Sequence, residues 1–465
     1  MTEPEVLIIG AGPAGYVSAI RLAQLGKKVL VVDEDEIGGV CLNRGCIPTK
    51  TLLHYTKIIS ETTKLNKFGI KFSKPEIDFN IFNQRVKEIP ARLRRSIIYL
   101  FRINDINFIN ATAHFTNNKS ILLTLPDGST QTINPRYIII ATGSEPLALA
   151  NISIDNQTII NSDKALEISE VPEKLIIIGA GAIGLEFATI YNRLGSKVEV
   201  IELMSQILPG TDLEIANHLM QIMTKQGIKF RLDTKLIKID RSNVLNLHIL
   251  YKQKEEITNA DKILIAVGRS SNLSKLGLEN TNIRLTEKKY ILVNDYYKTS
   301  QKDIYAIGDI IGPPLLAHKA MAQGIFVAEK IAGNLNIKLP QLIPNCVYTD
   351  PELATVGLTE SEAKALNYEL LIGKAPLIAI GRAHTLGQIE GLAKVIINKN
   401  TNQLLGAQIL APEASNLINE LTLIINSKLD ITQILDTVHP HPTLSEIVVE
   451  AVAAAYKKAI HIKNH

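Results

Sequence analysis

Two stretches of the chain carry the same succession of an apolar run, a glycine-rich turn and a helical pattern. Residues 6–15 read VLIIGAGPAG and residues 175–184 read LIIIGAGAIG, each an apolar strand that runs into Gly-x-Gly-x-x-Gly. After each turn come a helical stretch and a second apolar strand, which ends in an acid at Asp33 and at Glu202. Matching positions are offset by 169 residues, and each acid lies 23 residues after the first glycine. The pattern predicts two parallel-sheet units of one kind.

The glycine spacing has a physical reason in a dinucleotide site. The first glycine permits a tight turn, the second lets a pyrophosphate approach the backbone, and the third lets the helix pack closely on the strand. The free N–H groups at the helix N-terminus bind the phosphates, and the acid accepts hydrogen bonds from the adenosine ribose. The sequence therefore predicts two such sites, one with Gly10, Gly12, Gly15 and Asp33 and one with Gly179, Gly181, Gly184 and Glu202.

Three further apolar runs end in small-residue turns. Residues 137–143 (YIIIATG) and 263–269 (ILIAVGR) are interpreted as the last strands of the first and second units. Residues 303–309 (DIYAIGD) have a similar shape, which indicates that the chain returns to the first nucleotide site. We expect an α/β fold with two Rossmann-like dinucleotide-binding domains at 1–147 and 148–270, a central domain at 271–341 and an α+β C-terminal dimerisation domain at 342–465.

Composition and charge narrow the class of protein. The 465 residues are 46% hydrophobic and 21% charged, which excludes a disordered or collagen-like chain. The net charge of +4 is weak, and the basic cluster at residues 92–95 is better explained by a solvated helix face than by a nucleic-acid site. No uncharged apolar run reaches the ~18 residues of a membrane span. The first strand begins at residue 6, which leaves no room for a signal peptide, so we expect a cytoplasmic protein of bacterial type.

The three cysteines, Cys41, Cys46 and Cys346, are too few for a disulfide scaffold. Cys41 and Cys46 lie five positions apart in GGVCLNRGCIPTK, shortly after the first acid. On a regular helix their Cα atoms would be roughly 8–9 Å apart, whereas a disulfide needs about 4.4–6.8 Å. We therefore expect a distorted turn at Gly45, followed by a helix over residues 48–60. A redox disulfide is favoured over a zinc site because no histidine flanks the pair, and Cys346 is interpreted as a small buried hydrophobe in a strand.

The position of the cysteine pair indicates which dinucleotide each unit binds. Thiols exchange electrons readily with a flavin, and the pair follows the acid of the first site, so the first cofactor is interpreted as FAD. The second is then a nicotinamide nucleotide. Glu202 is a carboxylate and residues 203–206 contain no Arg or Lys, which favours NAD over NADP. No metal is expected.

A candidate base lies near the C-terminal end, in the segment HPHPTLSE at residues 439–446. His441 can take a thiol proton, and Glu446 can fix its tautomer and stabilise the imidazolium. Ser445 and Glu446 are expected to open the following helix, where an acid suits the helix dipole. Taken alone, the segment is equally consistent with a Pro-rich turn of solvated histidines. The redox pair elsewhere in the chain favours catalysis.

In this order the motifs resemble the pyridine nucleotide–disulfide oxidoreductase family along essentially the whole chain. The resemblance rests on GAGPAG, GGVCLNRGCIPTK, ATGSEP, GAGAIGLE, AVGR, YAIGD with LLAHKA, YTDPELATVGLTE and HPHPTLSE. It implies a homodimer in which His441 of one subunit acts on the disulfide of the other. It also implies an FAD site that includes Lys50, Gly143, Asp309 and Ala317, and an NAD site that includes Glu186 and Gly268.

Within the family, the chain is most similar to the branch that oxidises protein-bound dihydrolipoamide and reduces NAD⁺ to NADH. The implied partner is the lipoyl-bearing acyltransferase of a 2-oxoacid dehydrogenase complex, or the carrier protein of glycine cleavage. In the implied reaction a substrate thiolate attacks Cys41, and Cys46 passes the electrons through FAD to NAD. Lys50 would place a cation near the flavin.

Two positions depart from the commoner family pattern. Asp33 replaces the usual Glu, and Pro440 stands where a small residue is commoner. Both changes leave the reactive residues in place. A mercuric reductase would need a C-terminal cysteine pair, a glutathione reductase basic residues near Glu202, and a high-molecular-weight thioredoxin reductase an extra C-terminal redox centre. None of these occurs in the sequence, so another disulfide reductase of the family, mercuric or glutathione reductase-like, is the less favoured alternative. A flavoprotein with an additional non-catalytic binding role is the alternative from another class.

Overall fold

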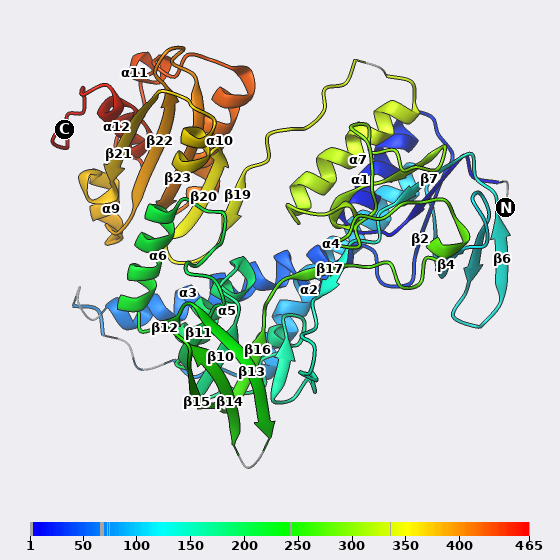
Figure 1. The fold of residues 1–465 in the computed structure, drawn as a ribbon, viewed down its shortest axis with the longest axis horizontal. Helices are drawn as coiled ribbons and strands as arrows, with labels where there is room; N and C mark the ends of the chain where they lie inside the picture. Colours follow the sequence, from blue (N-terminus) through cyan, green and yellow to red (C-terminus); the bar gives the residue numbers. More distant parts are fainter. Residues whose placement is uncertain are drawn as a thin grey trace.

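The computed structural model describes residues 3–464 except 66–68, 72, 74, 242–243 and 335. Within that part of the chain three five-stranded sheets form three lobes (Figure 1). Two of these sheets are parallel and belong to the two repeats, and the third is antiparallel and C-terminal. The predicted α/β class is confirmed.

The first lobe contains the first glycine motif. Its strand order is β18-β7-β1-β2-β3, with all neighbours parallel. Side chains of the central strand alternate between two buried faces, with Val6 and Ile8 against helices and Leu7 and Ile9 against a three-stranded meander, which explains the unbroken apolar run. The elements are β1 (Val6–Ile9), α1 (Pro13–Gln24), β2 (Val29–Asp33), α2 (Gly39–Arg44), α3 (Cys46–Lys64), α4 (Phe79–Ile103), β3 (Asn107–Asn110), the meander β4 (Thr112–Phe115), β5 (Ile121–Thr124) and β6 (Thr130–Ile133), β7 (Tyr137–Ile140), β18 (Ile304–Ala306) and α7 (Ala317–Ile331).

The second lobe repeats this plan. Its sheet has the order β12-β11-β10-β16-β9, and the meander β13-β14-β15 covers one face. The elements are β9 (Ile159–Asn161), β10 (Lys174–Ile178), α5 (Ala182–Leu194), β11 (Lys197–Ile201), α6 (Leu213–Lys225), β12 (Lys229–Arg231), β13 (Thr234–Arg241), β14 (Leu245–Tyr251), β15 (Lys254–Ala260) and β16 (Lys262–Ile265). A short antiparallel pair, β8 (Ser144–Pro146) and β17 (Arg269–Ser271), connects the two lobes.

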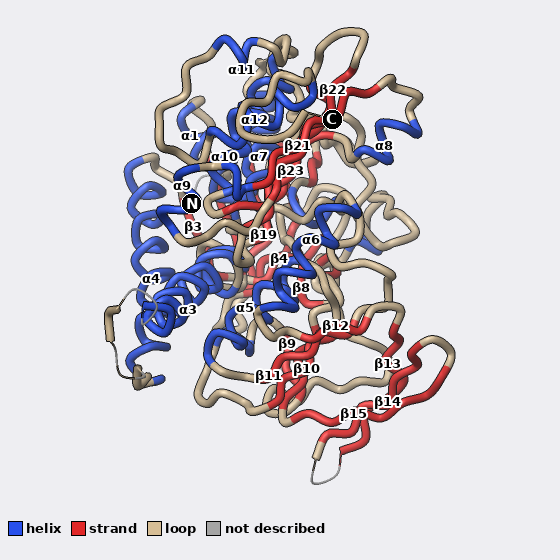
Figure 2. Tube along the Cα trace, turned by 90° about the vertical axis from the view of Figure 1, so that its left-hand side faces the viewer, coloured by secondary structure: helices blue, strands red, loops and turns tan. Residues whose placement is uncertain are grey.

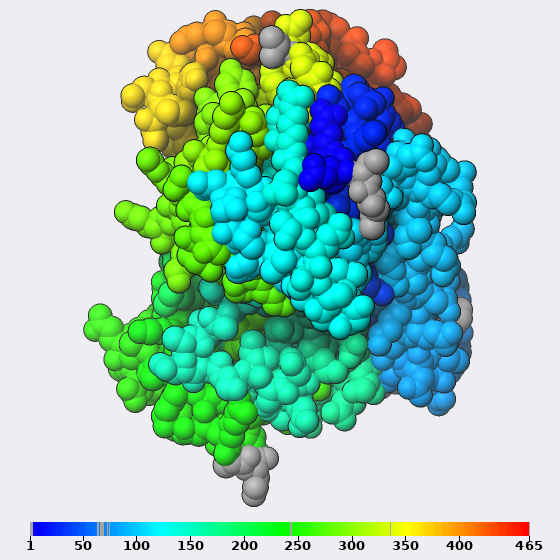
Figure 3. Space-filling view, turned by 90° about the vertical axis from the view of Figure 1, so that its right-hand side faces the viewer, coloured from blue at the N-terminus to red at the C-terminus, as the bar shows by residue number. Residues whose placement is uncertain are grey.

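The chain then returns to the first lobe, as residues 303–309 predict. β18 pairs in parallel with β7, and α7 packs against α1. The approach is close, because a Cβ on Gly324 would lie 2.8 Å from the carbonyl oxygen of Ala14. Figure 3 views the surface of this lobe, where the blue N-terminal residues lie beside the cyan segments of the meander. The domain boundaries at 147, 270 and 341 stay predictions.

The third lobe is the α+β unit expected at the C-terminal end. Its sheet has the order β19-β20-β23-β22-β21, covered by α10 and α12. The green helix α6 of the second lobe lies against it (Figure 1), and α3 and α4 lie side by side along one edge of the molecule (Figure 2). The elements are β19 (Asn345–Val347), β20 (Glu352–Gly357), α8 (Glu360–Ala365), β21 (Leu370–Pro376), α9 (Gly381–Leu386), β22 (Leu392–Asn398), β23 (Leu404–Ala411), α10 (Ala414–Ser427), α11 (Gln433–Asp436) and α12 (Glu446–Ala455).

Candidate functional site

Both predicted glycine loops adopt the same backbone. Gly10 and Gly179 have φ of +106° and +107°, a conformation that favours glycine. A Cβ on Gly15 would lie 1.8 Å from the carbonyl oxygen of Gly10, and one on Gly184 would lie 2.0 Å from that of Gly179. The middle glycine of each motif caps α1 or α5. The first and third glycines are therefore sterically required, and each loop presents a helix N-terminus at the end of a central strand.

Each predicted acid folds back onto its glycine loop. Ala11 N–H donates to Asp33 Oδ2 over 2.6 Å, and Ala180 N–H donates to Glu202 Oε2 over 2.7 Å. The second oxygen of each acid accepts from the amide two residues further on, at 2.9 Å in both loops. Burial raises the pKa of Asp33 although these amides oppose the shift. Each carboxylate is thus held at the loop and keeps lone pairs for ribose hydroxyls.

A pocket opens at the carboxyl ends of β1 and β2, where dinucleotides bind in such sheets. Its lining includes Gly10, Asp33, Thr112, Asn272 and Lys275, so the segment that follows β17 forms one wall of the pocket. A pocket that joins a glycine loop to a ribose acid fits the adenosine end of a dinucleotide.

The residues assigned by resemblance lie around the same loops. Asp309 Oδ2 accepts from Ser144 Oγ over 2.6 Å, directly beside Gly143, whose φ is +72° and whose Cβ position faces open space. Ala317 begins α7, and Gly268 lies just before β17 with φ of +122°. Sequence reasoning missed Arg269, which donates to Ser144 Oγ over 2.8 Å and to its carbonyl oxygen over 2.6 Å.

The cysteine pair lies where α2 ends and α3 begins. Gly45, between the helices, has φ −141° and ψ −113°, and a Cβ there would approach the Cα of Cys41 to 3.2 Å. The distorted turn at Gly45 and the helix over residues 48–60 are therefore confirmed. Cys41 and Cys46 are partly buried free thiols that hydrogen-bond to each other.

Lys50, one turn after Cys46, connects this turn to the second lobe. Its Nζ donates to both carboxylate oxygens of Glu186 in α5 over 2.9 Å and lies 4.5 Å from the centre of the Tyr348 ring. Tyr348 N–H donates to Glu186 Oε1 over 3.1 Å, and Glu186 is only 5% exposed. Sequence reasoning assigned Lys50 and Glu186 to different cofactors and missed their ion pair.

These neighbours shift the pKa values of the two thiols in opposite directions. The hydrogen bond from Cys41 and the charge of Lys50 lower the pKa of Cys46 to about 7, against burial and the charge of Glu186. The same hydrogen bond and burial raise the pKa of Cys41. Cys46 is therefore the more readily ionised thiol of the reduced pair, and the thiolate is the form that reacts with electrophiles.

Replacing Lys50 by Met is expected to shift this titration upward. Without the cation the Cys46 thiolate loses an attractive charge and the negative charge of Glu186 is no longer compensated, so the pKa of Cys46 should rise above its value of about 7. The rate of alkylation of the reduced protein by iodoacetamide, measured against pH, should move its midpoint up by about one unit or more. Lys57→Met, which removes a half-buried lysine of α3 that pairs with Glu61, is the matched control. An unchanged midpoint in Lys50→Met would contradict this origin of the shift.

His441 and Glu446 form the predicted dyad. His441 Nδ1 lies 2.9 Å from Glu446 Oε1, and Glu446 Oε2 accepts from Thr443 N–H over 2.9 Å. Burial disfavours the Glu446 carboxylate, but the bonds from His441 and Thr443 outweigh it and lower its pKa. Ser445 caps α12 and Glu446 begins it, as predicted. The His441 side chain is 74% exposed, so the ring is available at the surface.

One chain does not bring the dyad to the cysteines. Figure 1 places α12 in the C-terminal lobe and α2 near the middle of the molecule, below the first lobe. A single chain thus supplies a thiol pair and an exposed base in different lobes.

Family models match nearly the whole chain. Residues 4–324 match the model of pyridine nucleotide-disulphide oxidoreductases, and residues 343–452 match the dimerisation domain of these proteins. The chain belongs to the pyridine nucleotide–disulfide oxidoreductase family. A dihydrolipoyl dehydrogenase of Thermus scotoductus is 42% identical over 100% of both chains, and one of Bacillus subtilis is 37% identical over 99% of each. LpdA from Mycobacterium tuberculosis superposes with a TM-score of 0.89 at 26% identity, covering 96% of this chain and 98% of its own.

The third cysteine belongs to neither the dyad nor the glycine loops of this family member, although the charge of Lys50 reaches it. Cys346 is in β19, as the expected strand requires, and packs partly buried against the C-terminal core. Burial and the nearby Glu352 raise its pKa to about 11, so it is a protonated thiol at neutral pH.

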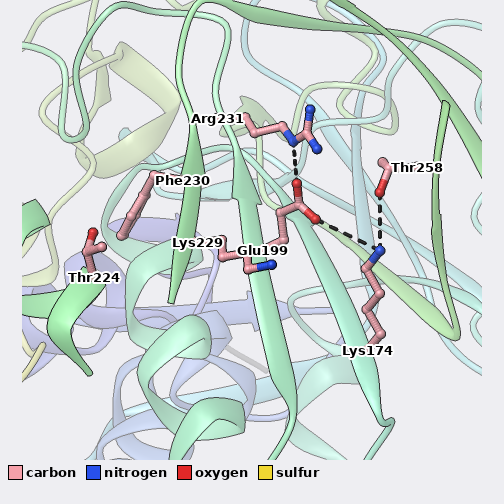
Figure 4. Close-up of a pocket in the computed structure, with 7 residues that line it drawn as sticks. All are labelled: Lys174, Glu199, Thr224, Lys229, Phe230, Arg231 and Thr258. Carbon is pink, nitrogen blue, oxygen red and sulfur yellow. Dashed lines mark hydrogen bonds and ion pairs between the residues drawn. The ribbon is translucent and has the colours of Figure 1, made fainter. Parts of the chain in front are cut away.

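A second pocket lies between the sheet and the meander of the second lobe (Figure 4). Three of its charged side chains are paired: Glu199 pairs with Arg231 and lies 4.0 Å from Lys174, and Arg231 also donates to Glu256 over 2.6 Å. Arg231 lies beside Glu202, whose N–H donates to the Arg231 carbonyl oxygen over 2.8 Å. Because its guanidinium is bound by two carboxylates, it is not presented to a ribose phosphate at Glu202.

Two absences concern the described residues only. None of their helices combines the length and apolar composition that a membrane-spanning helix needs. They also contain no group of three or more His, Cys, Asp or Glu side chains that could hold a metal ion.

Proposed function

We propose that the protein is an NAD-dependent dihydrolipoyl dehydrogenase, a flavoprotein that oxidises protein-bound dihydrolipoamide to lipoamide. The observation that carries the proposal is the Cys41–Cys46 pair next to Lys50, between two dinucleotide loops, with the pKa of Cys46 lowered to about 7. The curated relatives of the same length that bear this name support it.

The glycine loops and acids fit two dinucleotides. FAD would be held by Gly10, Gly12, Gly15, Asp33, Lys50, Gly143, Asp309 and Ala317, and NAD by Gly179, Gly181, Gly184, Glu186, Glu202 and Gly268. When bound, FAD would supply an acceptor for the electron pair of the thiols, and NAD⁺ would supply the final acceptor, which leaves as NADH. The paired Arg231 and the carboxylate of Glu202 favour NAD over NADP.

The protein's own residues carry the thiol chemistry. His441 from the partner subunit, oriented by Glu446, removes a proton from a dihydrolipoamide thiol. The resulting thiolate attacks Cys41 Sγ of the Cys41–Cys46 disulfide, which forms a mixed disulfide and releases Cys46 as a thiolate. The second substrate thiol loses its proton to water and attacks the substrate sulfur of the mixed disulfide, which releases cyclic lipoamide. Cys41 leaves as a thiolate and takes the proton that His441 holds. Lys50 stabilises the thiolate of Cys46 throughout.

This chemistry needs a homodimer, which the match to a dimerisation domain supports. The substrate thiols would come from the lipoyl-bearing acyltransferase of a 2-oxoacid dehydrogenase complex or from the carrier protein of glycine cleavage. A working disulfide in a chain with only three cysteines suits the reducing cytoplasm, where we place the protein.

The direct test is the spectrum and turnover of the purified protein. We expect a yellow protein that forms NADH from NAD⁺ and dihydrolipoamide and turns over poorly with NADP⁺. Oxidised glutathione with NADPH serves as the control substrate pair of a glutathione reductase. A colourless protein, or one that requires NADPH, would contradict the proposal.

A further inference from the structure

A buried lysine in the dimerisation region is surrounded by carboxylates. Lys394, in β22, is 2% exposed, and its Nζ lies 2.9 Å from Asp212 Oδ2, 3.0 Å from Glu214 Oε2 and 2.7 Å from Glu360 Oε2. Burial disfavours its charge, but the bonds to Glu360, Asp212 and Glu214 outweigh burial and raise the pKa of Lys394. These four residues form what we call the Lys394 cluster. Since Lys394 remains a cation, its position is fixed by charge as well as by packing.

The Lys394 cluster joins the second lobe to the third. Asp212 and Glu214 belong to the start of α6, within the part that matches the nucleotide-binding family model, whereas Lys394 and Glu360 lie in the part that matches the dimerisation domain. Asp212 uses both of its oxygens: Oδ1 accepts from Glu214 N–H over 3.1 Å and caps the helix, and Oδ2 accepts from Lys394. Lys394 therefore holds the N-terminal end of α6 through its capping residue.

The segment that leads into this cap forms part of the second nucleotide site. It starts at Glu202, whose carboxylate binds the N–H of Ala180 in the glycine loop. Midway, Leu208 N–H donates to the carbonyl oxygen of Ala180 over 2.9 Å, and the Leu208 side chain is buried. The segment ends at Asp212. The ten residues after Glu202 are thus fixed at one end by the glycine loop and at the other by Lys394.

We propose that Lys394 is a positioning residue for the NAD site, acting from the dimerisation region through Asp212 on the segment that carries Glu202. The inference rests on the proposed function in one respect, the assignment of the second site to NAD. Buried ion pairs often contribute little net stability compared with an apolar replacement. The experiment therefore tests whether the Lys394 cluster fixes the position of the segment that carries Glu202. A cluster that only joined the lobes would affect unfolding and leave nucleotide affinity unchanged.

The experiment measures ADP-ribose binding to the FAD-loaded protein by calorimetry. ADP-ribose carries the adenosine half of NAD but no nicotinamide, so it does not react with the thiols or the flavin. Asp212→Asn is the primary variant, because Asn still caps the helix while losing the charge that faces Lys394. Lys394→Met is the second variant. Lys374→Met, which removes the exposed partner of Glu214, is the matched control.

We expect the Kd for ADP-ribose and the KM for NAD⁺ to rise about tenfold in Asp212→Asn and Lys394→Met, within the usual range of coupling between separated sites. FAD content and reduction of the flavin by dihydrolipoamide should stay unchanged, as should all values in Lys374→Met. A lower Tm with unchanged Kd in Asp212→Asn and Lys394→Met would overturn the inference. Failure of the unaltered protein to bind ADP-ribose would instead contradict the proposed NAD site.

Discussion

The Cys46→Ser variant should lose lipoamide turnover by roughly a thousandfold or more, because removing one member of a group of residues that acts as a unit abolishes the catalysis of the whole group. Its FAD content should stay that of the unaltered protein. Cys46 supplies one sulfur of the proposed disulfide, and a hydroxyl cannot form it. The groups that build the first glycine loop do not include Cys46, since the loop depends on Gly10, Gly15 and the amide contact of Asp33. FAD binding should therefore survive.

The measurement is NADH formation from dihydrolipoamide, with flavin absorbance to quantify bound FAD. Cys346→Ser is the matched control, because Cys346 lies in β19 with a pKa raised to about 11 and has no part in the proposed thiol exchange. Cys346→Ser should retain turnover close to that of the unaltered protein. Turnover retained in Cys46→Ser would refute the redox assignment of the pair.

The two nucleotide loops could be predicted from the sequence because their constraints are local. Gly10 and Gly179 have a positive φ, and Gly15 and Gly184 each contact the glycine five positions earlier. The longer-range contacts, of Gly10 and Gly179 with the residues that follow β7 and β16 and of each acid through its strand pair, all stay within one unit of the repeat. The break at Gly45 was predictable for the same reason. Five residues of helix cannot bring two cysteines close enough, so the backbone must depart from a helix there.

The electrostatic environment of the site depends on pairs that no local pattern encodes. Lys50 and Glu186 are separated by 136 positions, and Lys394 and Asp212 by 182. Each pair forms only once separate lobes have packed against one another. A lysine one turn after a cysteine is an ordinary helix residue in sequence, and only the packing of α5 against α3 shows which carboxylate neutralises it. The role of Arg231 likewise depends on the folded structure, because its ion pairs with Glu199 and Glu256 keep its guanidinium from a ligand at Glu202.

Mixed dimers of two inactive variants should recover part of the turnover of the unaltered protein. His441→Gln alone should lower turnover by roughly a hundredfold to ten-thousandfold, the usual contribution of a positioned base. His441→Gln and Cys46→Ser homodimers are then both inactive. In a hybrid dimer, however, one site combines the intact cysteine pair of one subunit with the intact His441 of the other, while the second site lacks both.

Co-refolding equal amounts of the two variants should therefore give roughly a quarter of the turnover of the unaltered protein, since random pairing in a twofold dimer makes half of the dimers hybrid and each hybrid has one complete site. If His441 acted on the cysteines of its own chain, neither subunit of a hybrid would hold a complete set, and turnover would stay at the level of the separate variants. The His441 ring is exposed and lies shortly before α12 in the chain, and Figure 1 shows α12 in the C-terminal lobe and α2 near the middle of the molecule, which favours the first outcome. Co-refolding Cys46→Ser with Cys41→Ser is the control, because both lesions fall in the same half of the site, so a hybrid dimer holds no intact cysteine pair and should stay inactive.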